Sequence, residues 1–143
     1  MSIINAIKRA YEVNKQRNWT TVYWAIDLHG VCLNSNYDNG NYSFINEDVL
    51  EGLRAISNQK DSKIIIWSSW HEFEQPDIIK FFNMYGIRVD YFNKNPEIGN
   101  TKTGNFDSKF YFSILLDDKA GFNPDTDWVK IKNYLKKRTL ICY

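Results

Sequence analysis

The sequence has few of the residues that mark specialised protein classes. Its two cysteines, Cys32 and Cys142, are far apart in 143 residues, which argues against a disulfide scaffold or a cysteine-based zinc site. Three prolines and seven glycines exclude a collagen-like or linker-like chain. No apolar run approaches the ~20 residues of a transmembrane helix, and the first residues lack the basic start and apolar stretch of a signal peptide. We therefore expect a cytoplasmic protein with no membrane partner.

Apolar side chains, by contrast, are plentiful. Hydrophobic residues make up 43% of the chain and aromatic residues 16%. This composition is enough for a packed core, and the length suits a single domain over residues 1–143, with a helix within 1–18 preceding a core at 20–135.

Charge is nearly balanced overall but unevenly distributed. The net charge of +1 gives no general attraction to nucleic acid. Residues 1–17 carry +3 and residues 128–138 carry +5, which leaves −7 for the rest of the chain. The acidic middle indicates either a metal-binding centre or ordinary solvated helix faces. The basic ends favour nucleic-acid binding only if they fold toward the functional site.

Helical and extended patterns alternate along the chain. Apolar periodicity and capping residues predict helices at 3–16 after Ser2, from about Asn46, from Pro76 to Tyr85, and after Asp125 or Thr126. Runs of β-branched and aromatic residues predict strands at 20–26, 63–67, 87–92 and 110–116, and the polar stretch at 93–108 is expected to be a loop. Such alternation is typical of an α/β domain with a parallel sheet.

A hairpin is predicted between the first strand and the second helix. Asn39 and Gly40 lie between aromatic flanks within residues 36–42, and both residues tolerate the positive φ that a tight hairpin turn requires.

Polar residues follow three of the predicted strands. Asp27 ends the first strand, the pair Ser68 and Ser69 follows the second, and the pair Asp117 and Asp118 follows the fourth. Ligands of open α/β sheets bind at the carboxyl ends of the strands, so these side chains should converge on one site.

The order of these motifs resembles the haloacid dehalogenase (HAD) superfamily of phosphotransferases, over roughly residues 20–135. The family's first motif, Asp-x-Asp-Gly after a hydrophobic strand, stands here as Asp27-Leu28-His29-Gly30. Its second motif ends a strand in Thr or Ser, here Ser68, and its fourth is the Asp117-Asp118 pair. Its third is a single lysine before the last strand, for which Lys109 and Lys102 are the candidates.

The resemblance implies a HAD-like Rossmannoid fold: three α/β/α layers, a mostly parallel central sheet, and a β-hairpin flap after the first strand. The intervals between motifs leave no room for a large cap domain. By analogy, an open site of this kind suits bulky substrates such as a nucleotide, a phosphorylated nucleic-acid end or a phosphoprotein.

The resemblance also implies roles for the motif residues. Asp27 would attack phosphorus and form an aspartyl-phosphate. Mg²⁺ would be held by Asp27, Asp117 and the backbone carbonyl of His29, with Asp118 as a further ligand. Ser68 would bind the phosphoryl group, and Lys109 or Lys102 would neutralise it.

Several neighbouring residues are further candidates for substrate contacts. Gly30 belongs to the first motif, and Ser69 competes with Ser68 because the register at the strand end is ambiguous. Trp70 is a candidate for stacking on a base, although core packing is the commoner role of a tryptophan. His71 follows the second strand end and is a candidate for a substrate contact, although an ordinary helix-start or surface position is the commoner role of such a histidine.

His29 departs from the family pattern, in which the second Asp is the general acid/base. Histidine carries protons near neutral pH, with an unperturbed pKa of ~6.5. Three interpretations stay open: His29 acts as the acid/base, it leaves a slow enzyme that traps the aspartyl-phosphate, or it marks a binding protein without turnover.

The first functional hypothesis is a Mg²⁺-dependent phosphatase acting on a small phosphorylated substrate, such as a nucleotide, or on a nucleic-acid end. The alternative is a catalytically weak HAD-fold module that binds a phosphorylated ligand or protein partner. A phosphotransferase or mutase is a third possibility, which the lack of a cap disfavours.

Overall fold

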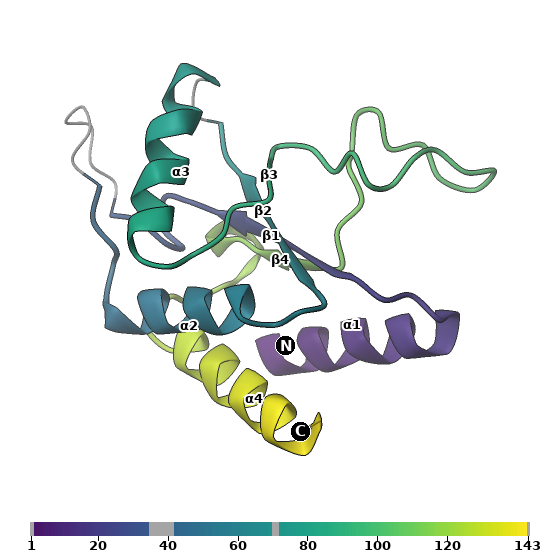
Figure 1. Cartoon of the computed structure of the whole chain (residues 1–143), viewed down its shortest axis with the longest axis horizontal. Helices are drawn as coiled ribbons and strands as arrows, with labels where there is room; N and C mark the ends of the chain where they lie inside the picture. Colours follow the sequence, from purple (N-terminus) through teal and green to yellow (C-terminus); the bar gives the residue numbers. More distant parts are fainter. Residues whose placement is uncertain (1, 35–41, 70–71, 143) are drawn as a thin grey trace.

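The computed structural model describes residues 2–34, 42–69 and 72–142, with the backbone alone at 140–142. Figure 1 shows a small central sheet packed against helices. The elements are α1 (Ile3–Arg17), β1 (Val22–Asp27), α2 (Glu47–Ser57), β2 (Ser62–Trp67), η1 (Glu72–Glu74), α3 (Gln75–Met84), β3 (Tyr91–Phe92), β4 (Ile114–Leu116), η2 (Asp118–Ala120) and α4 (Asp127–Cys142). Within the described residues, no helix is long and apolar enough to cross a membrane.

The helices form where the sequence predicts them. The Ser2 hydroxyl accepts a hydrogen bond from the Ile4 N–H, and the Asn46 side chain accepts one from Val49, so both residues satisfy N–H groups that a first helical turn leaves free. α4 begins at Asp127, directly after Thr126. These local signals explain why the predicted helix boundaries are close to the observed ones.

Four parallel strands form one sheet in the order β3-β2-β1-β4. The predicted α/β class with a parallel sheet is therefore confirmed. β1 is central, and its last residue, Asp27, pairs in register with Trp67 at the end of β2. The strand therefore carries Asp27 to the carboxyl edge of the sheet, between β2 and β4.

The two edge strands are shorter than predicted. A side chain replaces a backbone acceptor just before each one: Asp90 Oδ2 accepts the Ile64 N–H at 2.8 Å, and Ser113 Oγ accepts the Tyr23 N–H at 3.0 Å. The regular backbone ladder therefore begins only at Tyr91 and Ile114. These side-chain hydrogen bonds depend on tertiary contacts. The apolar runs at 87–92 and 110–116 therefore predict strands longer than the observed ones.

The sheet has helices on one face only, among the described residues. Buried side chains of α1, α2, α3 and α4 share one core cluster with alternate strand residues such as Trp24, Ile64 and Leu116. The opposite face, which carries Ala25 and Ile65, is covered by aromatic residues of segment 93–113. The expected three-layer α/β/α arrangement is therefore wrong for the second face.

Topology explains this asymmetry. The connections from β1 to β2 and from β2 to β3 run across the sheet in one direction, whereas the connection from β3 to β4 returns to the other edge. Parallel crossovers are almost always right-handed, so the first two place α2 and α3 on one face and the third crosses the other. Figure 1 shows this third connection in green, away from α2 and α4.

The base of the predicted flap is present. The Asn34 N–H donates to the Ser43 carbonyl, the Ile45 N–H donates to the Cys32 carbonyl, and Leu33 pairs antiparallel with Phe44. The expected Asn-Gly turn falls at residues 35–41, which lie outside the described residues.

Candidate active site

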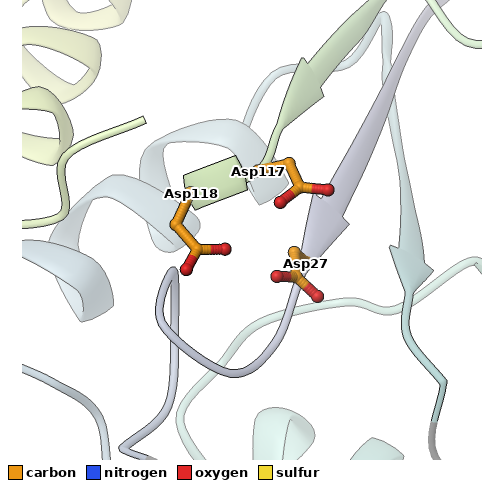
Figure 2. A group of neighbouring side chains, drawn as sticks. All are labelled: Asp27, Asp117 and Asp118. Atoms are coloured by element: carbon orange, nitrogen blue, oxygen red, sulfur yellow. The ribbon is translucent and has the colours of Figure 1, made fainter. Parts of the chain in front are cut away.

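Three carboxylates meet at the carboxyl edge of the sheet, where the arrows of β1 and β4 end (Figure 2). Oxygens of Asp27, Asp117 and Asp118 all lie within 4.8 Å of one another. β1 and β4 are also where the strand order reverses, since the chain proceeds from β1 toward β3 and then returns to the other side of β1. Ligands of open α/β sheets bind at this switch point.

The electrostatics of the cluster favour a bound cation. Burial and the nearby Asp117 carboxylate raise the pKa of Asp27 to about 7, and Asp118 adds to the shift. The three carboxylates therefore repel one another when all are ionised. Oxygen ligands of this kind suit a hard divalent ion, whose charge would offset the repulsion.

The chain packs tightly around the carboxylates. A Cβ on Gly30 would lie 2.6 Å from Asp118 Oδ2, and Gly30 has φ +82°. Only glycine adopts this conformation readily while leaving room for the Asp118 carboxylate. Asp27, Asp117 and Asp118 could together hold a metal ion.

Asp117 also organises the turn that follows β4. Its Oδ1 accepts the Lys119 N–H at 3.0 Å, and it precedes the short η2 turn. The turn ends at Gly121, which has a left-handed conformation. The second aspartate of the pair is thereby turned toward the Gly30 loop instead of continuing along the strand.

The loop after β1 is held by buried hydrogen bonds. The Leu28 carbonyl accepts N–H groups of Cys32 and Leu33, each at 2.8 Å, and the Trp128 indole N–H donates to the Val31 carbonyl at 2.8 Å. This loop carries His29, which is partly buried, and burial lowers the pKa of His29 below its ordinary value. The predicted use of its backbone carbonyl as a metal ligand stays a prediction.

Ser68 lies at the same edge of the sheet, held by a residue that the sequence did not single out. The Ser68 N–H donates to Asn93 Oδ1 at 2.8 Å, and Asn93 Nδ2 donates to the Ser68 carbonyl at 2.6 Å. Asn93 has φ +55°, a conformation that asparagine tolerates better than most residues. The sequence signal that could have pointed to Asn93 is its position directly after the predicted third strand. Ser69 is exposed.

The two candidate lysines lie in different places. Lys109 lines a pocket with Ala25 and Trp67, at the end of the sheet that carries the carboxylates. Both lysines are exposed, and the neighbours of Lys102, Thr101 and Thr103, line a different pocket beside Thr20 and Thr21, which precede β1. The structure therefore brings Lys109, and not Lys102, toward the carboxyl edge.

Trp67, the last residue of β2, is not a core residue. Its side chain is 44% exposed, because β2 ends there and the second face is open at that point. Trp70 and His71 lie outside the described residues.

Two arginines of the basic chain ends, Arg17 and Arg138, do not lie at the acidic edge. Arg17 lies 4.9 Å from the ring centroid of Trp19, shortly before β1, and Arg138 pairs with Asp61, just before β2, at 2.7 Å. Both arginines therefore lie by the amino ends of the strands. Lys132 pairs with Glu51 on α2.

Comparison of the chain with protein-family models, with curated proteins and with solved structures found no match in any of the three.

Proposed function

We propose that this protein is a Mg²⁺-dependent phosphatase that forms an aspartyl-phosphate on Asp27 and acts on nucleotides or phosphorylated nucleic-acid ends. The observation that carries the proposal is the group of three carboxylates, within 4.8 Å of one another, at the switch point of a parallel sheet. The HAD-like order of the motifs supports the same assignment.

The residues divide the chemistry between them. An Asp27 oxygen attacks phosphorus as the bond to the leaving-group oxygen breaks, and His29 gives that oxygen a proton. His29 then takes a proton from water, the water oxygen attacks the phosphorus of the aspartyl-phosphate, and the bond to Asp27 breaks. Inorganic phosphate leaves, and the Asp27 carboxylate is restored.

The other residues would bind the metal ion and the phosphoryl group. Asp27, Asp117, Asp118 and the His29 carbonyl would hold Mg²⁺, which neutralises charge on the phosphoryl oxygens when bound. Ser68 is held at the same edge by Asn93, where its hydroxyl can donate to a phosphoryl oxygen.

The decisive experiment is phosphate release with and without Mg²⁺, for the wild type and Asp27→Asn. The panel is a generic aryl phosphate, nucleoside monophosphates, and oligonucleotides phosphorylated at either end. We expect Mg²⁺-dependent release that Asp27→Asn abolishes. Asp125→Asn is the matched control, because it makes the same charge change at an exposed aspartate outside the cluster.

A folded wild-type protein that releases phosphate from none of these substrates would overturn the proposal. That result would favour the alternative, a module that binds a phosphorylated ligand or protein partner. His29, which stands where the family has its acid/base Asp, would then explain the loss of turnover. Transfer of phosphate to an acceptor other than water would instead indicate a phosphotransferase or mutase.

A further inference from the structure

A second feature lies on the helix-free face of the sheet, next to the carboxylates. A pocket of about 350 Å³ is lined mainly by Ala25, Trp67, Lys109, Phe110, Phe112 and Leu115. Its floor is the sheet itself, and its walls come from segment 93–113. None of these residues belongs to the acidic cluster.

The pocket and the carboxylates share one face of the sheet. Side chains alternate along a strand, so Ala25 and Asp27 project to the same side, as do Leu115 and Asp117. Trp67 also projects there, because it pairs in register with Asp27. Two residues of strand correspond to about 6.6 Å, so the pocket floor continues directly to the two carboxylates.

The walls of the pocket are aromatic and carry a positive charge. The rings of Trp67 and Phe110 meet edge to face, with centroids 5.4 Å apart, and the Trp67 side chain is still 44% exposed. The Lys109 ammonium lies 5.9 Å from the centroid of the Phe112 ring. An exposed indole beside a cation is suited to a planar aromatic group that belongs to an anionic ligand.

We infer that this pocket binds the nucleobase of a nucleotide substrate, with Trp67 as its stacking surface and the phosphate at Asp27. The inference rests on the proposed function and names the substrate class of that site.

The dimensions and charges favour a single nucleotide over a long nucleic acid. The volume lies at the lower end of the range of about 300–1,000 Å³ for small-molecule sites. Arg17 and Arg138, which would be needed to follow a phosphate backbone, lie by the opposite edge of the sheet. A single nucleotide therefore suits the pocket better than a long nucleic acid.

The test compares substrates with and without a base. We would measure kcat/KM for adenosine 5′-monophosphate and for ribose 5-phosphate in the wild type and in Trp67→Leu, which keeps an apolar side chain against Phe110. A stacked base contributes an amount that corresponds to about 5- to 150-fold in affinity. We therefore expect Trp67→Leu to lower the ratio of the two kcat/KM values at least about fivefold.

Trp19→Leu is the matched control. Trp19 is 42% exposed and also contacts an aromatic ring edge to face, but it precedes β1 at the other end of the strand. We expect its ratio to equal that of the wild type. An unchanged ratio in Trp67→Leu would overturn the inference. So would an equal loss with phenyl phosphate, because the pocket would then accept any aromatic leaving group.

Calorimetry separates this inference from the proposed function. Adenosine 5′-monophosphate is titrated into Asp27→Asn, which cannot turn over, with and without the Trp67→Leu change. Weaker binding by the double variant than by Asp27→Asn, found together with a wild type that releases no phosphate, would support the base pocket while the phosphatase proposal fails. No binding by folded Asp27→Asn would overturn the pocket, whatever the wild type does to its substrates.

Discussion

Gly30 leaves the space that the Asp118 carboxylate occupies. The backbone of Gly30 has φ +82°, and a Cβ there would lie 2.6 Å from Asp118 Oδ2. The loop after β1 and the turn after β4 therefore fit together through the absence of one side chain. This contact links the two acidic motifs, which are 90 residues apart in the sequence.

We predict that Gly30→Ala displaces Asp118 and weakens Mg²⁺ binding. The substitution places a methyl group against a carboxylate and strains a positive φ, so stability should also fall by about 1 kcal/mol or more. Thermal unfolding across a Mg²⁺ titration measures both effects. Gly86→Ala is the control, because Gly86 has φ +77° and no close neighbour. Equal Mg²⁺ affinity in the two variants would contradict the prediction.

The stability gained from Mg²⁺ should depend on pH through Asp27. Burial and Asp117 raise the pKa of Asp27 from its ordinary 3.8 to about 7. Between these values the unfolded chain has already released the proton that the folded protein keeps, so metal-free stability should fall as the pH rises from about 4 to 7. Mg²⁺ binds the ionised carboxylates and reverses this loss.

The increase in Tm on adding Mg²⁺ should therefore be larger at pH 8 than at pH 5. Differential scanning calorimetry at both values, with and without the metal, measures it. In Asp27→Asn the difference between the two pH values should shrink, since the titrating group is gone. An equal increase at both pH values in the wild type would speak against a metal site that contains Asp27.

His29 is predicted to act as the acid/base. His29→Ala should lower kcat by about 10²–10⁴-fold, the usual contribution of a positioned proton-transfer group. Rapid-quench kinetics should show whether phosphorylated Asp27 accumulates in the variant. His29→Asp supplies another proton-transfer group and should recover part of the rate. A His29→Ala protein with wild-type kcat would exclude the acid/base role.

Asn93 is predicted to position Ser68 for substrate binding. Asn93→Ala removes both hydrogen bonds to the Ser68 backbone. We expect KM to rise several-fold more than kcat falls, because the ground-state contact is lost. Asn18→Ala is the control, since Asn18 has φ +57° at the end of α1, far along the chain from Ser68. In both variants the strained positive φ should cost about 1 kcal/mol of stability, and an equal rise of KM in both would contradict the prediction.

Much of the fold follows from local sequence signals. Asn46 caps α2 through its own side chain, and β1 ends at Asp27 as its apolar run predicts. Helix caps and apolar periodicity act within a few residues, so the sequence expresses them directly. The placement of acidic residues at strand ends likewise predicted that Asp27, Asp117 and Asp118 would meet.

The sequence by itself thus determined the helices, the parallel sheet and the acidic residues at its carboxyl edge. Only the tertiary structure decided that Asp90 and Ser113 shorten the edge strands, that segment 93–113 covers the second face without a helix, and that Lys109 rather than Lys102 lines a pocket with Ala25 and Trp67. Each of these depends on partners distant in the chain. Strand order and crossover direction bring such partners together, and a local sequence pattern does not predict which distant residues will meet.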